Sequence, residues 1–190
     1  MKKLLLVSII AFSSVPLWAA MVNNPNCQDL VEVNDKFTPE YMAVLDGYSR
    51  RGKMTAGRVN IAGLVTESGK VKDECAKDKT AKVKTIRKAM MKTAKNSVPQ
   101  NTLQEDIDRK PTSTINPTKA KCSDFIALDE QYQPVAAYWV AGHSKAGKVN
   151  KGEIDEAYLE QPVATLIEDC RAAPTASFYD KTKTWFKKHI

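Results

Sequence analysis

The residues with the clearest chemistry in this sequence are four cysteines, Cys27, Cys75, Cys122 and Cys170. The first two lie 48 positions apart, and so do the last two. Four cysteines allow three disulfide connectivities. Pairing Cys27 with Cys75 and Cys122 with Cys170 is favoured, because each half of the chain then has its own complete bridge. Metal binding is the weaker alternative, since there is no C-x-x-C motif and neither histidine is near a cysteine in sequence. We therefore expect no metal site.

The equal spacing belongs to an internal repeat with an offset of 95 residues. The segment K-C-S-D-F-I-A-L-D-E-Q-Y-Q-P starts at Lys121, and its near copy N-C-Q-D-L-V-E-V-N-D-K-F-T-P starts at Asn26. Apolar, acidic and proline positions stay in phase between the two copies. We expect two tandem domains, residues 26–95 and residues 121–190. The polar stretch of residues 96–120 contains three prolines and is expected to be a linker.

The elements that position the cysteines are expected to be helices. Apolar residues recur at helical spacing, Pro134, Pro162 and Pro174 each begin an expected helix, and the first of these helices ends at Gly142. No alternating run is long enough to suggest a sheet. Each domain has about 70 residues, which is small for a stable core, and one bridge would add about 4 kcal/mol to its stability. The fold class is therefore all-α, with two small disulfide-stapled helical domains in tandem.

Residues 1–20 have the features of a secretory signal peptide. Lys2 and Lys3 form a charged start, residues 4–12 an apolar core, and Ala19-Ala20 a small-residue exit. The apolar run has about half the ~20 residues that a membrane span needs, so no stable membrane anchor is expected. We expect an exported protein whose cysteines meet an oxidising compartment.

Three features of the second repeat carry a family resemblance. They are C-S-D-F-I-A-L-D-E-Q-Y-Q-P, the 48-residue cysteine spacing, and A-S-F-Y-D-K-T-K-T-W-F-K-K near the end. With these features the second repeat resembles the HdeA family of periplasmic acid-stress chaperones over nearly all of residues 122–190, and the first repeat resembles a more divergent member. The resemblance implies a small helical fold and an ATP-independent, cofactor-free periplasmic chaperone. It also implies that strong acid dissociates and partly unfolds the protein, which then binds other unfolded periplasmic proteins and stops their aggregation.

Two repeats in one chain suggest that an internal pseudo-dimer replaces the usual homodimer, and a homodimer of whole chains is the other arrangement. Residues 27–95 have 15 basic and 9 acidic groups, whereas residues 122–190 have 8 and 10. Opposite net charges favour docking at neutral pH, and this attraction disappears when the acids are protonated. A simple solvated basic face is an equally good interpretation. Nucleic-acid binding is disfavoured by the signal peptide and by the lack of an aromatic-basic platform.

Three acids are the expected pH switch: Asp29 and Asp124 at equivalent positions beside the bridges, and Asp155 before Tyr158. The first repeat has Asn60 opposite Asp155, so it is expected to lack part of the switch. The hydrophobic surface expected to pair the repeats and to bind clients comprises Phe125, Tyr138, Trp139 and Val44. The alternative for these residues is an ordinary core.

Other functional classes have less support in the sequence. No G-x-S-x-G motif, phosphate loop or catalytic cysteine–histidine order is present, so we expect no enzyme and assign no catalytic residue. A secreted helical binding module or effector with one specific partner at neutral pH is the remaining alternative.

Overall fold

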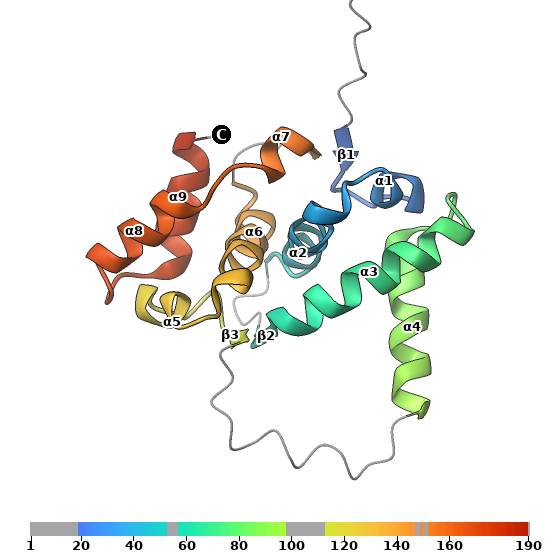
Figure 1. Cartoon of the computed structure of the whole chain (residues 1–190), viewed down its shortest axis with the longest axis horizontal. Helices are drawn as coiled ribbons and strands as arrows, with labels where there is room; N and C mark the ends of the chain where they lie inside the picture. The colour runs from blue at the N-terminus through green and yellow to red at the C-terminus, as the bar shows by residue number, and fades with distance from the viewer. Residues whose placement is uncertain (1–18, 53–56, 98–112, 147–148, 150–151, 190) are drawn as a thin grey trace, which may run out of the picture.

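The computed structural model describes residues 19–52, 57–97, 113–146, 149 and 152–189, and these residues are mainly helical (Figure 1). The first repeat contains α1 (Cys27–Val31), the 3-10 helix η1 (Asp35–Phe37), α2 (Thr38–Ser49), α3 (Ile61–Lys77) and α4 (Val83–Ser97). The second contains α5 (Cys122–Ile126), η3 (Glu130–Tyr132), α6 (Gln133–Ser144), α7 (Glu156–Leu159), α8 (Ala164–Ala172) and α9 (Phe178–His189). Helices α1, η1 and α2 coincide with α5, η3 and α6 when shifted by 95 residues. The expected all-α class is confirmed.

The repeats differ where the second one has a proline. Helix α3 is continuous, but the equivalent region of the second repeat is divided into α7 and α8 on either side of Pro162. Proline has no amide hydrogen and clashes with the preceding turn, which breaks the helix. Three boundaries also differ from expectation. Helix α8 begins at Ala164 and α9 at Phe178, each a few residues after its proline, and α6 continues to Ser144.

The described residues include four short strands, although none was expected from the sequence. Strand β1 (Ala19–Met21) pairs antiparallel with β4 (Glu153–Asp155), and β2 (Val59–Asn60) pairs with β3 (Thr114–Ile115). Such two- and three-residue strands are held by backbone hydrogen bonds and need no alternating side-chain pattern. Strand β3 lies inside the expected linker and its Ile115 is buried, so this end of the linker packs against the first repeat.

The start of the described chain overlaps the expected signal peptide. Ala19 and Ala20 belong to β1, and cleavage after residue 20 would remove them. Val22 would remain, and its buried backbone amide donates a hydrogen bond to the carbonyl oxygen of Gly152 at 2.7 Å. The rest of the expected signal, residues 1–18, lies outside the described residues. Among the residues described, no helix has the length and apolar character needed to cross a membrane.

Each repeat has one disulfide. Cys27–Cys75 joins α1 to α3, and Cys122–Cys170 joins α5 to α8, with Cα–Cα distances of 4.8 and 4.9 Å. Both bridges close loops between residues 48 positions apart, which is worth about 4 kcal/mol of unfolded-state entropy for each. The bridges therefore fix the short first helix of each repeat to a longer one.

The two repeats share one hydrophobic core. Helices α2 and α6 lie side by side at the centre of Figure 1, with α3 and α4 on one side and α5, α8 and α9 on the other. No other pair of elements in the described chain makes such an extensive contact. A single cluster of buried apolar residues runs through this contact into both repeats. The packing of α2 on α6 is therefore the main connection between the two repeats in the described chain.

Candidate functional site

The backbones of α2 and α6 cross in close contact at two glycines. A Cβ atom on Gly47 would lie 2.1 Å from the carbonyl oxygen of Trp139, and one on Gly142 would lie 2.1 Å from that of Val44. Gly47 corresponds to Gly142 under the 95-residue offset, and Val44 corresponds to Trp139. The contact is therefore the same on both sides, as in the two-fold interface of a homodimer. Here both surfaces belong to one chain.

The buried carboxylate of Asp46 lies at this contact. The side chain of Asp46 on α2 is only 3% exposed. Its Oδ2 accepts a hydrogen bond of 2.8 Å from the indole Nε1 of Trp139 in the other repeat. Arg87 Nη1 lies 2.6 Å from Asp46 Oδ1, and Arg50 Nε lies 2.9 Å from Asp46 Oδ2. The carboxylate thus connects a tryptophan of the second repeat to two arginines of the first.

The network continues through Arg87 on α4. Arg87 Nε and Nη2 donate to the two carboxylate oxygens of Glu67 on α3 at 2.7 and 3.1 Å. Side chains from α6, α2, α4 and α3 are therefore linked in one chain of polar contacts. The second repeat has no copy of it, because Ala141 stands at the position of Asp46 and Thr182 at that of Arg87. The polar contact between the repeats is accordingly one-sided, although the backbone crossing is symmetric.

The environment of Asp46 keeps its carboxylate ionised to a lower pH than that of an ordinary aspartate. Burial raises the pKa of this carboxyl, but Arg87, the Trp139 indole and Arg50 lower it, and the result is a pKa below the usual value. A carboxyl with a lowered folded-state pKa stabilises the fold above its unfolded-state pKa, and this stabilisation is lost as pH falls through the folded-state value. Ionised Asp46 therefore contributes to the stability of the contact between α2 and α6, and protonation of this carboxylate would remove that contribution.

The carboxylate of Glu40, also on α2, has the opposite effect on stability: its ionised form destabilises the fold. Burial raises the pKa of Glu40, and within the described residues its buried Oε2 has no hydrogen-bond partner. Its charge lies close enough to α6 to help raise the pKa of the Tyr138 hydroxyl, after the larger effect of burial. A carboxyl with a raised folded-state pKa destabilises the fold while it is ionised, and this cost disappears as pH falls through that pKa.

Glu40→Gln removes the buried charge and is therefore expected to stabilise the protein at pH 7, by on the order of 1 kcal/mol. The gain should disappear in acid, where Glu40 itself is protonated. Urea unfolding at pH 7 and pH 4 measures both effects. Glu130→Gln removes an exposed carboxylate from η3 and serves as the control. Unchanged or reduced stability of Glu40→Gln at pH 7 would contradict this assignment.

Asp29 and Asp124, the two equivalent acids expected to belong to the pH switch, lie in the first turns of helices. Asp29 Oδ2 accepts a hydrogen bond from the backbone amide of Asn26 at 2.8 Å. Asp124 Oδ2 accepts one from the backbone amide of Lys121 at 2.9 Å. Asp29 and Asn26 form a reciprocal capping box at the start of α1. Asp124 holds the equivalent N3 position of α5, where the N-cap Lys121 has no side-chain acceptor to complete the box. Both acids lie next to the disulfides and away from the contact of α2 with α6.

The third expected acid has an equivalent role in its own helix. Asp155 is the N-cap of α7, and its Oδ1 accepts a hydrogen bond from the backbone amide of Tyr158 at 2.8 Å. Asn60 caps α3 in the same manner, accepting from the backbone amide of Gly63 at 2.8 Å. The first repeat therefore has the same cap without a titrating group.

The four residues expected to form a hydrophobic surface do not lie together. The structure buries them all, with at most 1% exposure: Phe125, Tyr138, Trp139 and Val44. Only Val44 and Trp139 lie at the glycine crossing between the repeats. Phe125 stacks on Phe178 with a centroid distance of 4.3 Å, and Tyr138 hydrogen-bonds within the second repeat. All four are core residues in the structure. Separation of the repeats would uncover Val44 and Trp139, whereas Phe125 would stay covered until the second repeat itself unfolds.

The sequence interpretation missed Asp46, Arg87 and Glu40. One signal was available for Asp46, because it is a carboxylate in the apolar run Y-M-A-V-L-D-G, where the second repeat has only apolar residues and glycine. A charged residue in a buried helix needs a charged or hydrogen-bonding partner. The identity of that partner, Trp139, depends on which helices pack together.

The comparisons with known proteins agree with this architecture. The model of the HdeA/HdeB family matches residues 2–85 and again residues 88–180. This chain belongs to the HdeA/HdeB family. The two matches divide the chain between its repeats, although their limits differ from the expected domains 26–95 and 121–190.

Among the described residues, no cluster of three or more histidine, cysteine, aspartate or glutamate side chains is arranged to hold a metal ion.

Individual relatives point to the same family. Proteins named "Probable acid stress chaperone HdeA" from Brucella ovis, Brucella canis and Brucella melitensis are 33% identical to this chain over 87 residues. The aligned region covers 46% of this chain and 72% of each relative, as one repeat of a tandem protein would. No solved structure gave a significant match.

Proposed function

We propose that this protein is an ATP-independent periplasmic chaperone that binds acid-denatured proteins and prevents their aggregation at low pH. Acid activates it by protonating carboxylates, separating the two repeats and partly unfolding them. The activity is binding and not catalysis, and it needs no cofactor. The observation that carries the proposal is the buried Asp46 carboxylate, which joins the repeats through Trp139 and loses its charge in acid.

The surface offered to clients is the apolar face of α2 and α6, which each helix buries against the other at neutral pH. Val44 and Trp139 are fully buried there, so opening the contact would expose large apolar side chains without breaking a disulfide. At the same time the chain becomes strongly positive, since its 22 acidic residues are neutralised and its basic residues keep their charge. This charge would keep a chaperone–client complex soluble.

The acids at the helix starts are proposed to assist in the second repeat. Protonation of Asp124 and Asp155 would weaken the caps of α5 and α7, each worth about 1 kcal/mol. In the first repeat Asp29 would respond in the same way, but the amide of Asn60 would continue to cap α3 in acid. The first repeat would then retain more of its structure than the second when the two separate.

The purified protein is expected to suppress the aggregation of an unrelated client at pH 2–3 and to have little effect at pH 7, without nucleotide or metal. The reason is that the client surface is core at neutral pH and is released only when the acids are protonated. Light scattering of the client with and without the protein measures the effect. Equal protection at both pH values would leave a general binding protein without an acid switch.

The acid transition of the intact chain is expected to be nearly independent of protein concentration. The repeats are tethered, so each meets the other at an effective concentration on the order of millimolar. Cutting the chain between residues 98 and 112 should make the transition concentration-dependent, as for two separate chains. Tryptophan fluorescence during acid titration at two concentrations measures this. A midpoint that shifts strongly on dilution of the intact chain would instead favour a homodimer of whole chains.

A further inference from the structure

Helices α4 and α9 are equivalent in the repeat, but they pack differently. In α9, Phe186 is fully buried, and the Tyr179 hydroxyl lies 2.9 Å from Nδ1 of His143 on α6. This contact closes the space between α9 and α6. The equivalent residues in the first repeat are Met91 for Phe186, Lys84 for Tyr179 and Tyr48 for His143. These substitutions leave the space between α4 and α2 open, and Met91 is 46% exposed.

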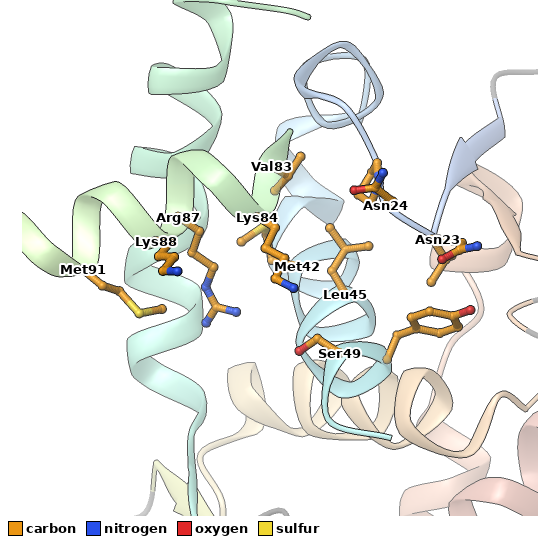
Figure 2. Close-up of a pocket in the computed structure, with 13 residues that line it drawn as sticks. Asn23, Asn24, Met42, Leu45, Ser49, Val83, Lys84, Arg87, Lys88 and Met91 are labelled. Atoms are coloured by element: carbon orange, nitrogen blue, oxygen red, sulfur yellow. The ribbon is translucent and has the colours of Figure 1, made fainter. Parts of the chain in front are cut away.

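The open space is a cavity of about 440 Å³ between α2, α4 and residues 22–25 (Figure 2). This volume is within the usual range of small-molecule sites, roughly 300–1,000 Å³. Its apolar lining includes residues from α2, from α4 and from the segment that precedes the first repeat: Val22, Met42, Leu45, Val83 and Met91.

Every charged residue that lines the cavity is basic: Lys84, Arg87 and Lys88. Arg87 is already paired with Asp46 and Glu67. Lys84 and Lys88 are exposed, and no carboxylate of the described chain forms an ion pair with either one. They are four residues apart on one face of α4, where like charges repel each other. Figure 2 shows Lys84 extending from α4 toward Met42 and Leu45 of α2. A single anionic group beside both lysines would relieve this repulsion.

We propose that this cavity binds a single-chain amphipathic anion, an alkyl chain of medium length that ends in one carboxylate or similar anionic group. The alkyl chain lies against Met42, Leu45 and Val83, and the anionic group lies between Lys84 and Lys88. Binding occurs in the folded protein at neutral pH and uses only the first repeat. It is therefore separate from the capture of unfolded clients, which uses the surface between the repeats.

Isothermal titration calorimetry with decanoate at pH 7, below its micellar concentration, is expected to give saturable binding at one site per chain. Two more methylenes should tighten binding about tenfold from octanoate to decanoate. Decanol, which has the same chain and no charge, should bind about tenfold more weakly than decanoate, because it cannot use the two lysines.

The double variant Lys84→Gln/Lys88→Gln changes only exposed side chains and is expected to weaken decanoate binding about tenfold. Its matched control is Lys183→Gln/Lys187→Gln, which removes two lysines with the same spacing from α9 and should leave binding unchanged. Leu45→Trp fills the cavity and should abolish binding, with the far-ultraviolet circular dichroism of the variant checking that it remains folded.

Several results would overturn the proposal. These are the absence of one-site binding to the wild-type protein, equal affinities for decanoate and decanol, and equal weakening by the α4 and α9 lysine variants. Sedimentation with phosphatidylglycerol vesicles in the absence of decanoate binding would also overturn it, since the lysines would then belong to a membrane-binding surface.

Discussion

Gly142→Ala is expected to separate the two repeats at neutral pH. Its new methyl group would lie 2.1 Å from the carbonyl oxygen of Val44, far inside van der Waals contact. The obstructing atom belongs to the backbone of α2, so no side-chain rotation can relieve the clash, and the helices must move apart. Overpacking of this kind costs about 1–3 kcal/mol even where neighbours can adjust, and more where they cannot. The variant should protect a client at pH 7, with its Trp139 emission shifted to longer wavelength.

Two further variants make this test specific. Gly47→Ala places the same clash on the other repeat, 2.1 Å from the carbonyl oxygen of Trp139, and should have the same effect. Gly69→Ala is the control, because a methyl group there meets nothing within 4 Å on the exposed side of α3. It should stabilise the protein by about 0.5–1 kcal/mol, since glycine disfavours helix interiors. Wild-type stability and emission in both Gly47→Ala and Gly142→Ala would contradict the tight crossing.

The sequence predicted the features that depend on neighbouring residues or that recur in both repeats. The equal cysteine spacing predicted two bridges within the repeats, and the structure has both. Helical spacing of apolar residues predicted the class of the fold, and the 95-residue offset predicted that α2 and α6 would be equivalent. These features depend on residues close together in the chain or on the comparison of one repeat with the other.

What the sequence did not predict depends on contacts between distant segments. Trp139 and Asp46 are 93 residues apart, and their hydrogen bond exists only because α2 packs on α6. The pairing of β2 with β3 is similar, because it brings residues 59–60 to residues 114–115 in the expected linker. Neither contact leaves a periodic pattern. The cavity beside α4 also needs the structure, because it results from how that helix packs and not from any motif.

The glycine crossing and the Asp46 network contribute differently to the contact between α2 and α6. The crossing brings the helices together at any pH, since glycine has no charge to lose. Asp46 would make the same contact dependent on pH, because the stabilisation from its ion pairs with Arg50 and Arg87 requires an ionised carboxylate. A variant at Asp46 should therefore change how stability depends on pH, whereas a glycine variant should change stability at every pH.

Asp46→Ala is expected to destabilise the protein by about 3 kcal/mol at pH 7. It leaves the indole Nε1 of Trp139 buried without its acceptor, and it leaves Arg87 with Glu67 as the remaining partner. Breaking a buried ion pair by removing one member usually costs about 3–5 kcal/mol. Urea unfolding followed by tryptophan fluorescence measures the loss. Asp73→Asn removes an exposed carboxylate from α3 and should have little effect.

Asp46→Asn tests whether the charge of this residue is the switch. Asparagine keeps an oxygen that can accept from Trp139, but it has no ionised form. Because the folded-state pKa of Asp46 is below its ordinary value of 3.8, the wild-type advantage should be complete above that value. It should shrink as pH falls through the lower, folded-state pKa. Free energies of unfolding measured from pH 6 to pH 2 should therefore converge for the two proteins in acid. A difference that stays constant over this range would mean that Asp46 contributes shape and hydrogen bonding to the interface but no response to acid.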